Sequence, residues 1–289
     1  MVKLGAGTLT IATNTAFTGT TYIEGGKLAY GCNDALNSQD MVVDGGATLD
    51  FAAYSDANLG AVTVKNGRIL ATGATSANSI AQAAGKNLNL GGGPSGSSAL
   101  LDTGAGKWVL APTSGGVNFD PANDPDKATL AGGLDLNGVN RTIGVGNSMG
   151  AGASVDLEVS AVISGTANYS ITKSGLGTLR LSGSNTFDGN FTISGGMAIL
   201  GNPQALGVPS KARTETVNSG YTLALDGVGI ADPNKYFTIS LAGAGNAQVG
   251  PVSGSLVSLA GTNSVPSAIK LVASTQIASL KSGDKLTLL

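Results

Sequence analysis

Apolar and polar residues alternate over short stretches along most of this chain. Residues Thr8–Ile11, Thr21–Glu24 and Val155–Val159 are representative, and glycine or asparagine residues separate such stretches. A period of two residues places successive side chains on opposite faces of an extended chain and predicts short β-strands. No stretch of adequate length shows the period of an amphipathic helix. The pattern therefore predicts an all-β protein with many short strands and tight turns.

The composition explains how so many turns are accommodated. Glycine accounts for 45 of the 289 residues, only 12% of the residues are charged, and 4% are aromatic. The mean hydropathy of +0.19 is too high for a disordered chain, and glycine adopts the backbone conformations that tight turns require. The single cysteine, Cys32, excludes an intramolecular disulfide framework. Stacking of strands is expected to stabilise the fold instead.

One stretch of the sequence recurs later in the chain, since Gly5–Ile11 aligns without gaps with Gly175–Leu181. Such recurrence is typical of proteins built from stacked units. We expect the two phenylalanines of the repeat to lie in the core as stacked rings. The structural residues of the two copies are Gly5, Gly7, Phe17, Gly25 and Gly26 in the first and Gly175, Gly177, Phe187, Gly195 and Gly196 in the second.

The second copy closely resembles the passenger-associated, or autotransporter-associated, β-strand repeat. The resemblance rests on Lys173–Gly189, on Ile193–Gly196 and on Leu200–Gly207, which fit the pattern K-x-G-x-G-T-L-x-L-x-G-x-N-x-Y/F-x-G, a strand, G-G and an L-G-N turn. The first copy, Lys3–Leu36, departs from this pattern: Thr13 and Thr15 stand where Gly183 and Asn185 do, and Cys32 replaces Asn202. The two matches cover about a quarter of the chain.

The resemblance implies a right-handed parallel β-helix, or β-solenoid, of about a dozen coils. We expect N-terminal coils with the first repeat copy over residues 1–90 and C-terminal coils with the second copy over residues 134–289. Residues 91–133 contain four prolines and few clear strands, and we expect an irregular region that protrudes from the rod.

The resemblance also implies a function in a structural or adhesive segment of a bacterial surface or autotransported protein. The expected location is extracellular, at the cell surface of a Gram-negative-type bacterium. The chain begins within a repeat and finishes on the apolar stretch Lys285–Leu289, so both ends are expected to expose unpaired strand edges. The expected partners are therefore a second copy, bound end to end or side by side, or a surface glycan or protein. The main alternative is a glycan- or protein-binding module that uses the irregular loops.

Catalysis is not expected. The chain contains no histidine, which excludes Ser-His and Cys-His nucleophile systems and the common zinc sites. Asp102 lies in a Leu-Leu-Asp-Thr-Gly-Ala stretch similar to the aspartic protease signature, but an acid protease needs two such carboxylates. A carbohydrate-active β-helix enzyme remains a weaker alternative.

Two candidate ligand sites fall in the irregular region. Lys107 and Trp108 are candidates for contact with a glycan or protein, although Trp108 packing over the apolar interior is an equal alternative. Asp120, Asp124 and Asp126 are the candidate Ca²⁺ ligands, with a solvated loop as the favoured interpretation and no cofactor expected.

Charge and hydropathy exclude two classes of partner. The formal net charge is −2 and the 16 lysine and arginine residues are scattered, so there is no basic surface for nucleic acid. No apolar stretch approaches the length of a membrane-spanning helix, and we expect no membrane insertion by this segment.

Overall fold

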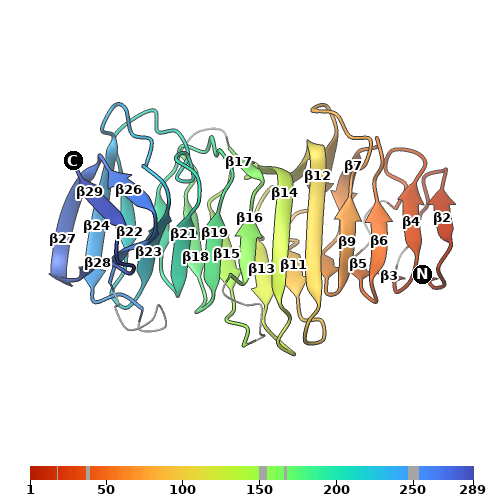
Figure 1. Ribbon diagram of the computed structural model, residues 1–289. Coiled ribbons are helices and arrows are strands. Elements are labelled where there is room, and N and C mark those ends of the chain that lie inside the picture. Colours follow the sequence, from red (N-terminus) through yellow and green to blue (C-terminus); the bar gives the residue numbers. More distant parts are fainter. Residues whose placement is uncertain (18, 37–39, 150–154, 166–167, 247–253) are drawn as a thin grey trace.

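The computed structural model describes all residues except 18, 37–39, 150–154, 166–167 and 247–253. The described residues form strands and turns without an α-helix, and they build two long parallel sheets that face each other along an elongated molecule (Figure 1). The predicted β-solenoid is confirmed. Within the described part of the chain, no helix is long and apolar enough to cross a membrane.

Sheet A has twelve strands. In spatial order these are β1 (Val2–Lys3), β3 (Thr21–Ile23), β5 (Met41–Val43), β8 (Val62–Val64), β11 (Leu88–Gly91), β13 (Val117–Asp120), β15 (Arg141–Val145), β18 (Ile171–Ser174), β20 (Phe191–Ile193), β22 (Arg213–Val217), β24 (Phe237–Gly243) and β27 (Ala268–Thr275).

Sheet B has fifteen strands. Its main path is β2 (Thr8–Ile11), β4 (Lys27–Tyr30), β6 (Ala47–Asp50), β9 (Gly67–Leu70), β12 (Ser98–Val109), β14 (Lys127–Asp135), β16 (Leu157–Val159), β19 (Thr178–Leu181), β21 (Met197–Leu200), β23 (Thr222–Asp226), β25 (Leu256–Ala260) and β28 (Ile277–Ser279). The strands β7 (Asp56–Leu59), β10 (Ser79–Gln82) and β17 (Val162–Ser164) pair beside this path, and β26 (Thr262–Val265) pairs with β29 (Lys285–Leu288).

Each coil contributes one strand to sheet A, a short turn, one strand to sheet B and a longer loop back to sheet A. The twelve strands of sheet A confirm the expected dozen coils. Coil length varies, since Lys173 pairs with Ile143 on one side and with Ile193 on the other, and the first of these coils is half as long again as the second. Parallel strands stack at about 4.8 Å, so twelve of them span roughly 50 Å.

The core follows from the alternating pattern. Inward-facing apolar side chains occupy one register position coil after coil, because a period of two keeps every second residue inside. One such column in sheet B consists of five buried side chains from successive strands: Leu28, Leu49, Ile69, Leu101 and Leu130. Each coil therefore covers the apolar side chains of the coil before it.

The segment 91–133 differs from the irregular, protruding region that its composition suggests. It contains β12 and β14, the two longest of the described strands, and β13, all of which pair in parallel within the two sheets. The physical reason is the placement of the prolines. Pro94, Pro112, Pro121 and Pro125 all fall between strands, where they interrupt no ladder hydrogen bond.

Candidate functional site: the repeat turns

The lysine of the second repeat copy lies inside the solenoid. Alternation along β18 points Ile171 and Lys173 inward, and Lys173 is fully buried. Its Nζ atom donates to the carbonyl oxygens of Gly175 and Gly177, both at 2.6 Å, and of Gly195 at 2.8 Å. Gly175 and Gly177 belong to the turn of the lysine's own coil, whereas Gly195 belongs to the turn of the next coil. The ammonium group therefore links two successive coils at the corner between sheets A and B.

The first copy has a similar arrangement, in which Leu4 replaces the counterpart of Gly177 as the third acceptor. Lys3 Nζ donates to the carbonyl oxygens of Leu4 at 2.9 Å, Gly5 at 2.8 Å and Gly25 at 2.9 Å. Gly25 is the counterpart of Gly195, again on the following coil. The two lysines lie at equivalent positions of the two copies, and both supply donors to carbonyl groups of the turns. We call these two constellations the repeat turns.

Burial controls the electrostatics of the second repeat turn. Loss of solvent lowers the pKa of Lys173 to about 7, and the nearby Asp156 carboxylate acts in the opposite direction. Burial also raises the pKa of Asp156, which accepts hydrogen bonds from the backbone N–H groups of Ser148 at 2.7 Å and Thr178 at 2.6 Å. These groups hold the backbone at a corner of the solenoid.

Two glycines of the repeat turns, Gly196 and Gly26, are required by close approach of neighbouring coils. Gly196 has φ of +55°, and a Cβ atom there would lie 2.3 Å from the carbonyl oxygen of Gly177 on the preceding coil. Gly26, its counterpart, has φ of +61° and equally close neighbours. Only glycine combines this backbone conformation with this spacing.

Buried arginines perform a similar task at the opposite end of the sheet A strands. Arg141 donates to the carbonyl oxygens of Leu136 and Gly115, and Arg213 donates to that of Gly189 at 2.6 Å. Arg213 also forms a buried ion pair with Glu215 at 2.7 Å, and its guanidinium lies 4.7 Å from the ring centre of Phe237. Burial raises the pKa of Glu215 to about 7, with Arg213 opposing.

The two repeat phenylalanines do not share one environment. Phe187 is fully buried, as expected, whereas Phe17 is 39% exposed. In the second copy, Asn185 accepts from the N–H of Ile163 on the preceding coil and donates to the carbonyl oxygen of Ala205 on the following one. Thr15 replaces this asparagine in the first copy, where the coil has a neighbour on one side only. The expectation of equivalent core rings is therefore wrong for Phe17.

Trp108 packs in the interior and is not available to a ligand. Its side chain is 0% exposed, and its ring meets that of Phe51 edge-on at 6.3 Å between centroids. Lys107, its neighbour on β12, points outward and forms an ion pair with Asp135 at 2.8 Å. Alternation along β12 explains the difference, since adjacent residues of a strand face opposite sides. Of the two alternatives for Trp108, the structure places it in the core.

The three candidate Ca²⁺ ligands serve local turns. Asp120 accepts from the N–H of Ala122 at 2.9 Å, Asp124 accepts from that of Met149 at 3.2 Å, and the N–H of Asp126 donates to the carbonyl oxygen of Ser97 at 2.8 Å. Across the described ranges, no three acidic, histidine or cysteine side chains lie close enough to hold a metal ion. Asp102 likewise accepts from the N–H of Gly104 at 2.8 Å.

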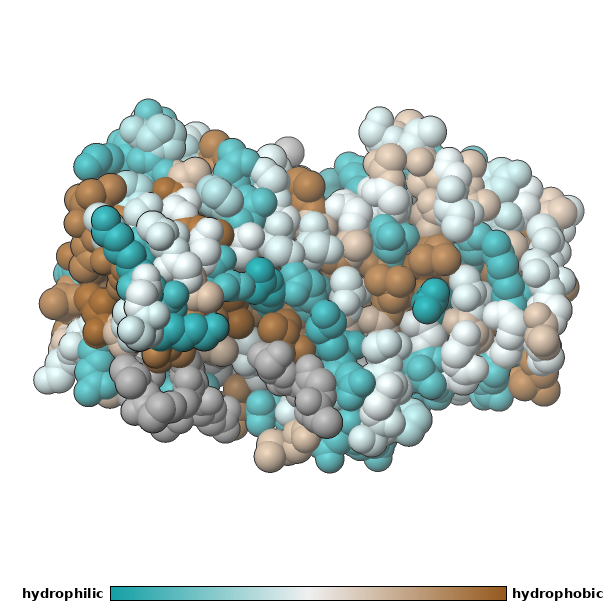
Figure 2. Space-filling model, viewed as in Figure 1, coloured by the Kyte–Doolittle hydropathy of each residue, from teal (hydrophilic) through white to brown (hydrophobic). Residues whose placement is uncertain are grey.

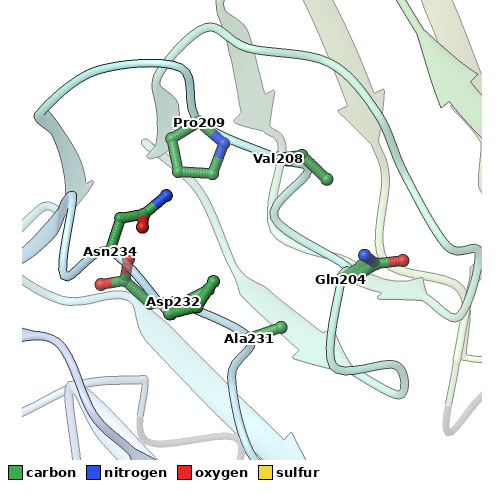
Figure 3. A pocket seen from close by; sticks show the side chains of 7 residues that line it. Gln204, Val208, Pro209, Ala231, Asp232 and Asn234 are labelled. Atoms are coloured by element: carbon green, nitrogen blue, oxygen red, sulfur yellow. The ribbon is translucent and has the colours of Figure 1, made fainter.

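A small cavity of about 120 Å³ lies between two successive loops (Figure 3). Val208 and Pro209 line it on one side, and Ala231, Asp232 and Asn234 line it on the other. Asp232 already accepts from the N–H groups of Tyr236 and Phe237 and from the hydroxyl of Ser267. The carboxylate is thereby committed to the turn, and the cavity is too small for a sugar or nucleotide.

Lys3, Lys173, Arg141 and Arg213 were not among the site residues predicted from the sequence. A signal for them was present, since Lys173 follows the apolar Ile171 by two residues and alternation places both on the same face. An inward-facing cation in an otherwise apolar column marks a place where backbone oxygens need a donor.

Comparison with known families agrees with this geometry. A family model described as Passenger-associated-transport-repeat matches residues 1–29 and 171–197. The two matched segments contain the two repeat turns, one in each. No curated protein and no solved structure matches the chain. The chain therefore carries two segments that match the passenger-associated-transport-repeat of autotransporter passengers, both within one parallel β-solenoid.

Proposed function

We propose that this chain is a structural, non-catalytic rod segment of a secreted or surface-exposed passenger of a Gram-negative bacterium. The observation that carries the proposal is the match of both repeat turns to the passenger-associated repeat, together with the unbroken stacking of twelve coils. A rod of stacked coils holds whatever it carries at a fixed distance from its attachment point. The repeat turns suit this role because Lys173 and Lys3 each donate a hydrogen bond to a carbonyl oxygen of the following coil.

Surface exposure is tested on intact cells. An epitope inserted after Ser76, in the exposed loop between β9 and β10, leaves both main sheets uninterrupted. We expect antibody to label intact Gram-negative cells that produce the parent protein with this insertion. Labelling that requires permeabilised cells would contradict the proposal, and a periplasmic marker protein reports whether the outer membrane stayed intact.

End-to-end self-association is a second candidate, favoured by the exposure of core columns at both ends. Leu271 on β27 continues the buried column of Leu241 but is 59% exposed, and Leu9 on β2 continues the buried column of Leu28 but is 41% exposed. Hydrophobic side chains gather at the C-terminal end of the molecule (Figure 2). Strand edges of this kind pair readily with another chain. Addition of a second copy in parallel would bury both surfaces.

Sedimentation velocity over a range of concentrations tests this candidate. We expect the unmodified chain to form dimers and longer species, and Leu271→Lys to shift the distribution to monomers. The matched control is Val208→Lys, a comparably exposed position on the side of the rod. A chain that remains monomeric at the highest concentration, or equal loss of association in both variants, argues against end-to-end contact.

A further inference from the structure

Two polar clefts lie on the same side of the solenoid, where the chain passes from the loops into sheet A. Each has a volume of about 400 Å³. The first is lined by Asn87, Ser114, Asn118, Asn140 and Thr142 among others, and the second by Asn168, Ser170, Asp188, Asn190, Lys211 and Thr214 among others. Neither takes part in the repeat turns, which lie at the other end of the sheet A strands.

The two clefts are consecutive. The first spans the starts of β11, β13 and β15, and the second spans those of β18, β20 and β22, which are the next strands of sheet A. Asn140 of the first cleft accepts a hydrogen bond from the N–H of Ser170 of the second, at 2.8 Å. Together they form one groove across six strands, which we call the corner groove, with a length of about 24 Å at five strand spacings.

The outer face of sheet A continues the corner groove with hydroxyl groups. Thr142, Thr172, Thr192 and Thr216 pair in register on four successive strands and point outward. Among the described residues, no hydrogen bond engages these four hydroxyls or the side-chain amide of Asn190. The groove thus presents donors and acceptors, repeated at the strand spacing, that are left to solvent or to a ligand.

The charge and polarity of the groove restrict the class of ligand. Its charged residues are the exposed Lys211, the half-buried Asp188 and the buried Arg213. Arg213 is paired with Glu215, so a polyanion meets no cluster of exposed cations. Peptide addition as an extra strand is excluded along the groove, because each of the six strands already pairs on both sides. Amide and hydroxyl groups without a net charge match a ligand whose hydroxyls both donate and accept.

We propose that the corner groove binds an extended, neutral glycan chain that lies along the solenoid axis. This proposal rests on the proposed function in one respect, because a surface-exposed rod is placed where it can meet a glycan. The residues that line the groove include no aromatic side chain, so no single sugar gains a stacking contact. Affinity must therefore accumulate over several sugar units, and it rises with chain length until the glycan fills the groove.

Calorimetric titration of the purified chain tests this length dependence. The probes are neutral glucan, mannan and N-acetylglucosamine oligomers of two to eight units, with sulfated heparin fragments for comparison. We expect at least one neutral series to bind, with the six-unit oligomer binding about tenfold or more tightly than the two-unit oligomer. Binding of heparin fragments alone, or of no neutral series, would overturn the proposal.

Two substitutions locate the binding. Thr214→Arg on β22 places a long charged side chain in the second cleft, whereas Thr129→Arg on β14 places the same side chain on the outer face of sheet B. We expect the first to lower affinity about tenfold or more and the second to leave it unchanged. Asn190→Ala, which we expect to weaken binding several-fold, is the test variant if circular dichroism shows that Thr214→Arg does not fold. Equal binding by Asn190→Ala and the unmodified chain contradicts the assignment whether or not surface display on cells succeeds.

Discussion

At the scale of single residues, the buried cations of this solenoid perform the task that water performs at an exposed corner. A turn carbonyl that is sealed beneath the next coil must find a donor. Lys173 supplies that donor to three carbonyl oxygens, and Lys3 does the same in the first copy. The pattern of alternation predicts the inward direction of both lysines. The carbonyl groups that they bond were not predictable, because the sequence does not show how closely the turn of the next coil approaches.

The pKa of Lys173 makes the stability of the chain depend on pH. An unfolded lysine has a pKa of about 10.4, whereas burial lowers the folded value to about 7. Between these values the unfolded chain binds more protons than the folded chain, so the free energy of unfolding rises with pH from about 7 to about 10. Chemical denaturation across this range should show the rise in the unmodified protein and its loss in Lys173→Met.

We expect Lys173→Met to be destabilising at pH 9 by roughly 2–4 kcal/mol, because the carbonyl groups of Gly175, Gly177 and Gly195 lose the amine as a donor. Lys211→Met, at an exposed lysine, is the matched control and should alter neither the stability nor its pH dependence. Parallel pH profiles for the unmodified chain and Lys173→Met would show that the buried amine does not titrate in this range.

At the scale of elements, the strands were largely predictable and their roles were less so. Period-two stretches predicted β2, β3 and β16, and in β3 and β16 the alternation corresponds to one buried face. The segment 91–133 was misjudged because its prolines lie close together in sequence, yet all of them fall in the turns that flank β12, β13 and β14. The corner groove was not predictable, since it is assembled from residues on six separate coils.

Glycine in the turns provides a test of coil-to-coil packing. Gly196 and Gly220 both have positive φ, but a Cβ atom at Gly196 would overlap Gly177 and Leu176, whereas one at Gly220 meets nothing within 4 Å. Gly220→Ala should cost about 1 kcal/mol from backbone strain alone. Gly196→Ala should cost about 3 kcal/mol or more, because the turn must also move away from the preceding coil. Thermal unfolding of both variants measures the difference, and equal losses would argue against close stacking at the repeat turns.

At the scale of the whole molecule, the two copies of the repeat lie a fixed distance apart along the solenoid. The first copy begins on β1 and the second on β18, and seven strand spacings separate these strands in sheet A. The sequence predicts that the two copies are similar and that there are about a dozen coils. It does not predict their separation, because coil length varies from one pair of stacked strands to the next.

The most direct test of the stacked solenoid is the distance between the two repeat turns in solution. Ala6 and Leu176 are equivalent, exposed positions, and Cys32→Ser removes the single native thiol before labels are attached. Pulsed electron spin resonance between nitroxides at Ala6→Cys and Leu176→Cys should give one narrow distribution near 35 Å, the length of about seven parallel strand spacings. A distribution centred below about 20 Å, the separation expected if the two copies packed side by side at sheet-packing distance, would contradict the account.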